Sequence, residues 1–410
     1  MSDAAAETAP APEAEGKQEA TPAPAPAAPV KEVKSIVLTG FGGVKMMKVQ
    51  QKPEPTAGEE EVLIRVKACG MSFPDLMVRQ GVIDHPPKTP IILGFECAGV
   101  IEAVGANVTT FSVRDRVVAF SDYKAWSELV AIPAKYVYKI PDSLNFHDAA
   151  ALLMNFVVAY IIMFDLAGVR EGHSILAHSL GGGVGQAIVQ LANTIPNVVI
   201  FGTASAHKHE AIKSKGNVAH LFDHSVDYTQ AIRKESSDGV DIVLDCLCGD
   251  DTNKGIAILK PMGKYILFGS SNIVTGETKS FFSFAKSWWQ VDKINPLKLY
   301  DDSKLIGGFQ LRRLLFRQGY YEYVSKVVSK VLDLFSQGKI KPTIDSVWAF
   351  EDVGEAMQKL CDRKNVGKII LDPAAEPRPK SPEKKAPEAT PNAEGTPAGE
   401  EKKEPLANGE

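Results

Sequence analysis

The chain has 410 residues, of which 44% are hydrophobic and 23% are charged, and its net charge is −4 at pH 7. This is the composition of an ordinary globular protein that is long enough for two domains. The small net charge gives no reason to expect binding to nucleic acid.

The two ends of the chain have the composition of disordered tails. Residues 1–32 consist mainly of Ala, Pro, Glu and Thr, and residues 373–410 mainly of Pro, Glu, Lys and Ala. The first tail lacks the apolar segment of a secretory signal and the arginines of a mitochondrial presequence. We therefore expect a cytoplasmic protein.

Residues 33–155 are predicted to form a β-rich domain. Short alternating strands separated by glycine and proline run through it, for example Val62–Val66, Ala98–Val104 and Arg116–Phe120. The apolar run Ala149–Phe164 is shorter than the ~20 residues that a helix needs to cross a bilayer. We interpret this run as a core helix, so that a contact with membranes would be peripheral.

The next stretch has the order strand, glycine turn, helix and second strand. Ser174–His178 is a short apolar run, Ser179–Gly185 is rich in glycine, Gln186–Thr194 has apolar residues at helical spacing, and Asn197–Phe201 is β-branched. A glycine triplet alone could be a tight turn, but these flanking elements are those of a dinucleotide-binding unit. In such a unit the glycines let a pyrophosphate approach the helix N-terminus.

The residues after the second strand favour NADP over NAD. NAD sites usually place Asp or Glu there, where the carboxylate binds the ribose 2′-hydroxyl. This chain has Ser205 and Lys208 instead, and no carboxylate before Glu210. A 2′-phosphate suits these residues better than a hydroxyl does. The alternative is that Lys208 is a solvated loop lysine.

The remaining patterns complete two domains. Strands predicted at 219–222, 241–245 and 264–268 extend the nucleotide-binding domain over residues 156–304. Residues 305–372 are predicted to return to the first domain. The elements expected there are helices at 321–337 and 353–363 and strands at 347–350 and 368–371.

The five cysteines are predicted to be reduced and buried, because they are odd in number, widely scattered and set in apolar runs. Cys246 and Cys248 form the one close pair. In a strand-like run over 241–248 their side chains would point to one face. No second pair completes a metal site, so we interpret both as structural thiols.

Short motifs are spread along most of the chain, at Gly94–Val100, Val104–Gly105, Asp115–Val117, Gly182–Gly185, Gly202–Ser205 and Gly367–Leu371. Together they resemble the medium-chain dehydrogenase/reductase superfamily and, within it, the quinone oxidoreductase branch. Four more motifs, Ala68–Gly70, Asp75–Gly81, Lys208–Ala211 and Ser287–Gln290, are similar to the vesicle amine transport protein homologues. The resemblance covers residues 33–372.

The resemblance implies an α/β protein in which a GroES-like β-rich domain is joined to a Rossmann domain with a doubly wound parallel sheet. It also implies that NADPH binds in the cleft between the two domains. The superfamily's alcohol dehydrogenases hold a catalytic zinc at positions that match Ser72 and Phe95 here. Serine is a poor zinc donor and phenylalanine offers none. We therefore predict a zinc-independent protein with no metal site.

The resemblance also assigns residues to the cofactor. It implies that Gly182, Gly183, Val184 and Gly185 hold the pyrophosphate, that Ser205, Lys208 and Tyr228 bind the 2′-phosphate end, that Phe268, Gly269 and Ser270 lie at the nicotinamide ribose, and that Asn365 and Lys368 close the far edge. For Tyr228 the alternative is a half-buried surface tyrosine. The aromatic run Phe281, Phe282, Phe284, Trp288 and Trp289 could line a pocket or serve packing.

Four residues near the expected substrate and cofactor need separate interpretation. Ser72 replaces the asparagine usual in quinone reductases, Val158 replaces a threonine that contacts the nicotinamide amide, and Leu180 replaces a small residue beside the pyrophosphate. Either these changes are neutral, or they weaken NADPH affinity or turnover. Ser72 and Asp75 are the candidate catalytic residues on the substrate side. The alternative for Asp75 is an acid that stabilises a helix start.

We therefore predict an NADPH-dependent oxidoreductase that transfers hydride to a quinone or an α,β-unsaturated carbonyl, as a homodimer. The alternative is an NADPH-binding sensor of weakened catalysis that acts through partners or through peripheral association with membranes or vesicles.

Overall fold

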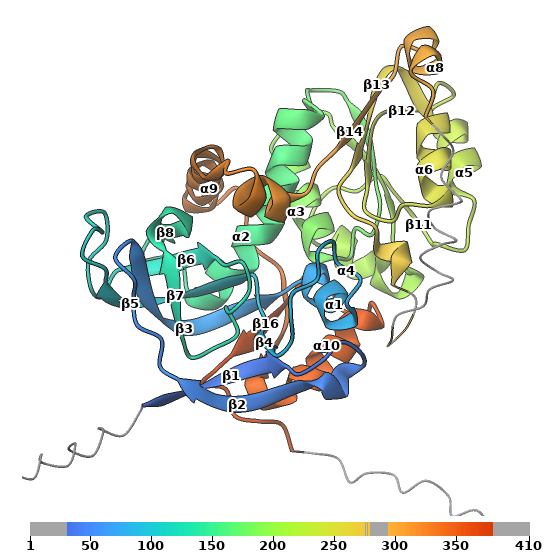
Figure 1. Ribbon diagram of the computed structural model, residues 1–410. Coiled ribbons are helices and arrows are strands. Elements are labelled where there is room, and N and C mark those ends of the chain that lie inside the picture. The colour runs from blue at the N-terminus through green and yellow to red at the C-terminus, as the bar shows by residue number, and fades with distance from the viewer. Residues whose placement is uncertain (1–30, 275, 277, 279–293, 380–410) are drawn as a thin grey trace, which may run out of the picture.

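Three β-sheets organise the described part of the chain, which comprises residues 31–274, 276, 278 and 294–379 of a computed structural model. Two of the sheets lie in the first domain, and the third lies in the second domain (Figure 1). The aromatic run Phe281, Phe282, Phe284, Trp288 and Trp289 and most of both predicted tails fall outside the described residues.

The first domain is β-rich, as its alternating short strands predicted. Its elements are β1 (Glu32–Leu38), β2 (Met47–Pro53), β3 (Glu61–Met71), α1 (Phe73–Gln80), β4 (Ile91–Ile92), β5 (Glu96–Val104), β6 (Arg116–Phe120), β7 (Leu129–Pro133) and β8 (Val137–Lys139). Strands β2, β1 and β4 form a small sheet. Strand β3 is the centre of the larger sheet, because it pairs antiparallel with both β5 and β7.

The second domain contains a six-stranded parallel sheet in the order β11-β10-β9-β12-β13-β14. Its elements are β9 (Ser174–Ala177), α3 (Gly183–Ala192), β10 (Val199–Thr203), α4 (His209–Lys213), β11 (His220–Phe222), α5 (Tyr228–Glu235), β12 (Val240–Asp245), α6 (Asp250–Ala257), β13 (Leu259–Leu267), α8 (Pro296–Asp301) and β14 (Leu305–Gly308). Strand β9 is buried throughout, as expected of a central parallel strand. This strand order is that of dinucleotide-binding domains, which confirms the predicted Rossmann fold.

The C-terminal part of the chain returns to the first domain. It comprises α9 (Tyr321–Ser336), β15 (Ile344–Ala349), α10 (Val353–Cys361) and β16 (Lys368–Asp372), and β16 pairs with β3. One predicted boundary differs from the structure. Strand β14 pairs with β13, so residues 305–308 complete the parallel sheet and do not yet belong to the return.

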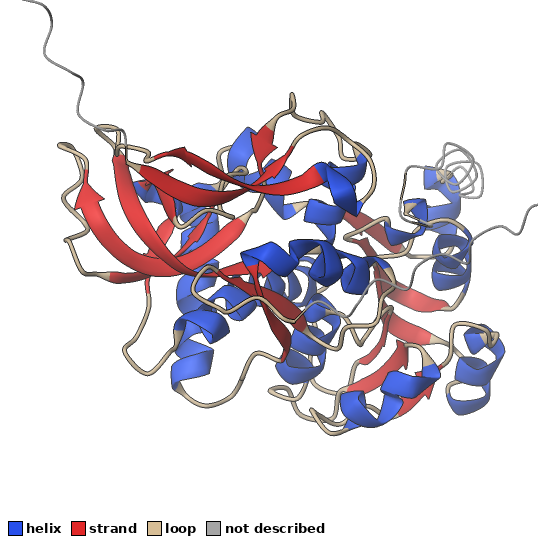
Figure 2. Ribbon diagram, turned by 90° about the horizontal axis from the view of Figure 1, so that it is seen from below, coloured by secondary structure: helices blue, strands red, loops and turns tan. Residues whose placement is uncertain are grey.

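Helix α2 (Phe146–Tyr160) and its π-helical extension Ile161–Leu166 lie between the two domains. Figure 2 shows helices between the strands of the two domains. The segment Phe146–Leu166 is long and apolar enough to cross a membrane, but 72% of its most apolar window is buried inside the protein. It packs on β3 and β5 on one side and on α3 and α9 on the other. The prediction of a core helix is confirmed.

The close cysteine pair does not lie in a strand. Strand β12 ends at Asp245, whose carboxylate accepts hydrogen bonds from the backbone N–H of Leu247 at 2.6 Å and of Cys248 at 3.3 Å. These bonds turn the chain, and Cys248 has a φ of 66°. The predicted common strand face of Cys246 and Cys248 is therefore wrong. All five cysteines are free thiols, as predicted, but only Cys69 and Cys97 are buried, and the other three are partly exposed.

Candidate functional site

A cleft of about 350 Å³ lies between the two domains. Its walls come from α1, α2, the glycine turn before α3, the end of β13 and the loop before β16. All predicted site residues except Asp75 and Tyr228 line it, namely Ser72, Gly182, Gly183, Val184, Gly185, Ser205, Lys208, Phe268, Gly269, Ser270, Asn365 and Lys368. The structure thus brings together residues from both domains.

The N-terminus of α3 opens into this cleft. Gly182 is its N-cap residue, and no side chain caps the first amides. A Cβ atom on Gly183 would lie 2.4 Å from Nδ2 of Asn155, so the turn packs directly against α2. Uncapped amides at a helix N-terminus bind phosphate groups well. The turn therefore fits the pyrophosphate of a dinucleotide.

The loop before β16 is hydrogen-bonded to the glycine turn. The backbone N–H of Gly367 donates to the carbonyl of Gly181 at 2.9 Å, and Gly367 forms a parallel bridge with Gly182. Gly367 has a φ of 90°, and a Cβ there would lie 2.3 Å from the carbonyl oxygen of Thr343. A glycine is required at this position. The two domains are thus joined at the point where the cofactor is expected.

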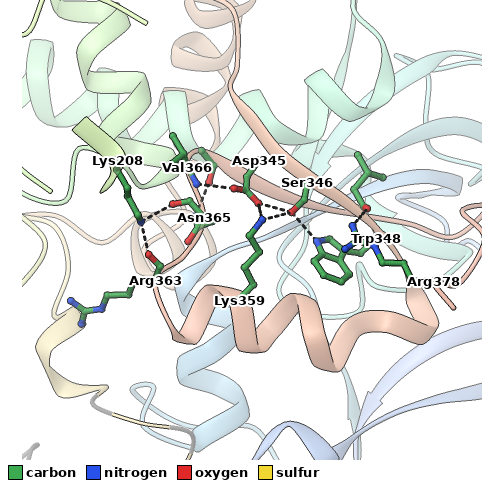
Figure 3. Close-up of polar contacts among 11 residues, drawn as sticks. Lys208, Asp345, Ser346, Trp348, Lys359, Arg363, Asn365, Val366 and Arg378 are labelled. Atoms are coloured by element: carbon green, nitrogen blue, oxygen red, sulfur yellow. Dashed lines mark hydrogen bonds and ion pairs between the residues drawn. The ribbon is translucent and has the colours of Figure 1, made fainter. Parts of the chain in front are cut away.

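Lys208 closes the same corner of the cleft from the side of the Rossmann domain (Figure 3). Its ammonium donates to the backbone carbonyls of Asn365, at 2.8 Å, and Arg363. The side chain is only 6% exposed, so Lys208 is not a solvated loop lysine. Burial lowers its pKa. Since an ammonium has three N–H donors, the third remains for a ligand phosphate.

The loop that accepts these bonds is itself held in place (Figure 3). The carboxylate of Asp345 accepts a hydrogen bond from the backbone N–H of Val366 at 2.8 Å and forms an ion pair with Lys359 at 2.6 Å. Asn365 donates from Nδ2 to the carbonyl of Gly367 at 2.8 Å. The protein's own hydrogen bonds and ion pair therefore hold this wall of the cleft in place.

Tyr228 does not line the cleft. Its hydroxyl donates to Asp251 Oδ1 at 3.0 Å, and its ring packs edge-on against His178 at 5.3 Å between centroids. Burial raises the pKa of this hydroxyl. Neither the expected contact with a 2′-phosphate nor the alternative of a half-buried surface tyrosine holds, because the side chain is buried beside the parallel sheet.

On the opposite wall, Ser72 and Lys368 form the floor of the cleft, and the fully buried Glu96 lies behind them. Lys368 Nζ contacts both Ser72 Oγ and Glu96 Oε1, and the Ser72 hydroxyl donates to Glu96 Oε1 at 3.3 Å. Glu96 Oε2 accepts a hydrogen bond from the backbone N–H of Met154 at 2.9 Å. Ser72, Glu96 and Lys368 are 9%, 0% and 3% exposed. Glu96 was missed from the sequence, although a carboxylate within a buried strand is an available signal.

Asp75 has the alternative role, that of an acid at a helix start. Its Oδ2 accepts a hydrogen bond from the backbone N–H of Ser72 at 2.8 Å, which completes a capping box at the start of α1. The carboxyl group is fully buried, and burial raises its pKa to about 8. Asp75 does not line the cleft, so the structure does not support a direct role on the substrate side.

The two departures on the cofactor side have different positions. Val158 lines the cleft, as expected. Leu180 is fully buried, and a Cβ on Gly202 would lie 2.0 Å from its Cδ1. The bulk of Leu180 therefore fills the core above β10. It does not lie beside the pyrophosphate path, because the missing side chain of Gly202 leaves space for it inside the domain.

Other cleft residues were not identified from the sequence. His178 is buried, and its Nδ1 shares a hydrogen bond with Thr203 Oγ1 at 3.1 Å. Burial lowers the pKa of this imidazole. Burial raises the pKa of the Cys246 thiol to about 12. The apolar end of the cleft is formed by Met71, Phe73, Met77, Met154 and Leu360. They come from separate segments, so no local pattern in the sequence marks them.

The floor of the cleft does not fit zinc. Phe95 is buried against the ring of Tyr123, at 5.1 Å between centroids, and offers no ligand atom. Of the two nearby carboxyl groups, Glu96 is paired with Lys368 and Asp75 caps the start of α1. In the described residues no three His, Cys, Asp or Glu side chains come together. This donor set does not suit zinc, which prefers several thiolate or imidazole ligands.

Comparisons with known proteins agree with this architecture. Residues 58–142 match the alcohol dehydrogenase GroES-like domain, and residues 221–371 match a family described as zinc-binding dehydrogenase. The human protein named synaptic vesicle membrane protein VAT-1 homolog-like is 57% identical over 349 residues, which are 85% of this chain and 83% of the relative. The chain belongs to the VAT-1 homologue family.

Further similarities place the VAT-1 homologue family among the medium-chain dehydrogenases/reductases. The crystal structure of the human VAT-1 homolog-like protein has a TM-score of 0.75 at 49% identity and covers 84% of this chain and 99% of that one. A quinone oxidoreductase from Pongo abelii is 28% identical over 347 residues, 83% of this chain and 98% of the relative. The predicted superfamily and the predicted combination of GroES-like and Rossmann domains are confirmed.

Proposed function

We propose that the protein is an NADPH-dependent oxidoreductase that reduces a quinone or an α,β-unsaturated carbonyl. The observation that carries this proposal is a single cleft that joins an uncapped helix N-terminus, a buried lysine and an apolar pocket. A mycobacterial protein solved in complex with NADPH has a TM-score of 0.72 at 27% identity over 83% of this chain and all of that one. The enoyl reductase CurK has a TM-score of 0.71 at 26% identity.

Bound NADPH would supply a hydride in this cleft, and the protein would supply position and a dry surface. The amides at the start of α3 would bind the pyrophosphate, and Ser205 with Lys208 would bind the 2′-phosphate. Phe268, Gly269 and Ser270, which follow β13, would lie along the nicotinamide ribose.

The opposite end of the cleft favours a flat or extended apolar substrate. Met71, Phe73 and Met154 face it, and methionine adapts its shape to different apolar ligands. Apart from Ser72 and Lys368 at the floor, this end offers few polar groups. A conjugated carbonyl compound combines an apolar body with one oxygen that such a floor could bind.

The first test is a fluorescence titration with NADPH and, separately, NADH, followed by turnover with a panel of quinones and enones. We expect a lower Kd for NADPH than for NADH. Lys208→Ala should weaken NADPH binding about tenfold more than it weakens NADH binding, since the charge-assisted hydrogen bond to the 2′-phosphate contributes about 1.5 kcal/mol and only NADPH carries that phosphate. The exposed Lys213→Ala is the matched control. A protein that binds neither nucleotide contradicts the proposal.

The second candidate is an NADPH-binding sensor. It is favoured by Val158, which lines the cleft and offers no hydrogen bond to a nicotinamide amide. A sensor would bind NADPH with the same preference but would oxidise it no faster when quinones or enones are added. The turnover panel therefore separates the two candidates.

We also propose that two copies associate along β14. In the described part of the chain this strand is the edge of the parallel sheet, and apolar side chains near it are solvent-exposed. Met262 is 73% exposed, Leu297 71%, Tyr300 81% and Leu305 48%. An unpaired strand edge with exposed apolar side chains favours pairing with another copy. Light scattering should report a dimer, and Leu305→Glu should give a monomer, whereas Val113→Glu at a distant exposed site should not.

For location we propose the cytoplasm, with peripheral contact to vesicles. The relatives are named synaptic vesicle membrane proteins, and the one long apolar helix in the described residues is mostly buried. Flotation with liposomes that contain anionic lipids tests this proposal. Protein that stays at the bottom of the gradient at low and moderate salt contradicts it.

A further inference from the structure

Reduction of a conjugated carbonyl requires a proton as well as a hydride. We propose that Ser72 donates this proton, that Lys368 replaces it, and that Glu96 positions Lys368. Ser72 and Lys368 would be catalytic residues, and Glu96 a positioning residue. This inference rests on the proposed function.

The contacts of the three side chains set a direction for proton transfer. Lys368 has no acceptor atom, so it donates to both Ser72 Oγ and Glu96 Oε1. A hydroxyl that accepts a hydrogen bond from an ammonium is a stronger donor itself. The Ser72 hydroxyl can rotate from Glu96, where its bond is long at 3.3 Å, towards a ligand in the cleft.

The backbone fixes the position of each member. Ser72 stands at the N-cap of α1, directly after β3, with an extended φ of −129°. Glu96 opens β5 and is held by the N–H of Met154 in α2. Lys368 opens β16, which pairs with β3 so that Ile369 lies opposite Met71. A Cβ on Gly70 would lie 2.3 Å from Glu96 Oε1, so glycine at that position leaves room for the trio.

The reduction consists of one hydride transfer and two proton transfers. Bound NADPH would supply a hydride to the β-carbon of the unsaturated carbonyl, and the electrons of the carbon–carbon double bond would move towards the carbonyl. The O–H bond of Ser72 breaks as its proton forms a C–H bond at the α-carbon, which gives the saturated carbonyl compound. An N–H bond of Lys368 breaks as that proton moves to Ser72 Oγ. After product leaves, neutral Lys368 takes a proton from water in the open cleft.

The other titratable groups at the cleft are less suited to this step. The carboxyl of Asp75 is turned to the start of α1, and the Cys246 thiol has its pKa raised to about 12 by burial. His178 lies at the Rossmann side, hydrogen-bonded to Thr203. The charged groups near Lys368 are Glu96, in contact, and Asp75, which acts on it through space.

The test uses the full chain with NADPH and compares enone with quinone reduction. Ser72→Ala should lower kcat for an enone about 100-fold, the usual loss when a general acid is removed, with the Kd of NADPH unchanged. Ser72→Thr, which keeps the hydroxyl, should retain most of the activity. Quinone reduction should fall much less, because a hydroquinone anion is readily protonated by water.

The role of Lys368 is tested by substitution. Lys368→Met should lower kcat for the enone about as much as Ser72→Ala does, because no group then returns a proton to Ser72. Lys368→Arg, which keeps the charge but gives up a proton far less readily, should be slow as well. If Lys368→Met unfolds, the double variant Lys368→Met with Glu96→Gln removes both charges together. If this double variant melts near the temperature of the unaltered protein, a loss of its activity is due to catalysis and not to unfolding.

Three outcomes contradict the inference. Ser72→Ala with full enone activity excludes Ser72 as the donor, while the proposed function stands. An equal loss with enone and quinone, together with a raised Kd for NADPH, indicates a structural role for the trio. A protein that binds NADPH but reduces nothing in the panel overturns both proposals.

Discussion

The two walls of the cleft are built on different principles. On the Rossmann side, one continuous stretch, Gly181–Gly185, offers backbone amides, and its glycines are packed so closely against neighbouring atoms that side chains would not fit. On the GroES-like side, three side chains from three distant segments, Ser72, Glu96 and Lys368, form a buried charged group. The structure of the first wall depends on close packing of the backbone, and that of the second wall depends on the pairing of the Lys368 and Glu96 charges.

This difference determines which substitutions each wall tolerates. Adding atoms damages the Rossmann side, because its turn packs against α2 and β10. Removing one charge damages the GroES-like side, because a buried charge without its partner is costly. The experiments below test this contrast, beginning with the largest expected effect.

Glu96→Ala should lower the free energy of unfolding by about 3–5 kcal/mol, because it leaves the Lys368 ammonium buried and unpaired. Urea denaturation measures the change. The control is Glu102→Ala, which breaks the exposed ion pair with Arg65 at 2.7 Å and should cost about 0.2–1 kcal/mol. Equal losses of unfolding free energy in the two variants would mean that the buried ion pair contributes no more to stability than the exposed one.

Leu180→Ala should lower the free energy of unfolding by about 3 kcal/mol, because it leaves a cavity beside Gly202. The Kd of NADPH should stay within a factor of two, since the side chain faces the core. Leu297→Ala, at a side chain 71% exposed, is the control and should cost almost nothing. A large rise in the Kd of NADPH would mean that the Leu180 side chain lies beside the pyrophosphate after all.

Val158→Thr should tighten NADPH binding about fivefold, because one added hydrogen bond contributes about 1 kcal/mol. The side chain has nearly the same size and already lines the cleft, so stability should change little. Fluorescence titration measures the effect. An unchanged Kd would show that the loss of threonine at this position is neutral.

The last prediction concerns the dependence of stability on pH. The pKa of Asp75 is raised by burial to about 8, from about 4 in the unfolded chain, so between these values the folded state holds the extra proton. Its contribution to stability therefore declines as pH rises from about 4 to 8. Asp75→Asn should remove this decline in urea denaturation at a series of pH values.

Asp115 is the matched control, because its pKa shift has the opposite direction to that of Asp75. Its pKa is lowered by the hydrogen bond from Lys139, so its contribution to stability is lost as pH falls through the folded-state pKa. Asp115→Asn should therefore flatten the acid side of the stability profile and leave the range from pH 5 to 8 unchanged. The same change from both variants would contradict the assignment.

The Rossmann wall could be predicted from sequence because its information is local. The turn before α3, the helix itself and strand β10 follow one another within a few residues, and the glycines stand at fixed spacing. The position of Lys208 was predicted as well, but not its bonds to carbonyl groups near Asn365. Those bonds depend on a loop some 150 residues further along the chain.

Most of the GroES-like wall could not be predicted from the sequence. Ser72 and Lys368 were identified through resemblance, but nothing local links them to Glu96, because the antiparallel pairing of β3 with β5 and β16 brings them together. Leu180 was misread for a similar reason. The direction of its side chain depends on the space above Gly202 in the next strand.

Helix α2 gives the molecule one further property. Its apolar side chains share one hydrophobic core with residues of both domains, among them Val118 and Phe120 of the first and Ile175 and Ile188 of the second. Neither domain can unfold without exposing apolar side chains of the other domain to water. Unfolding should therefore be one cooperative event that spans both domains, and the backbone amides of α2 should be among the last to exchange with deuterated solvent.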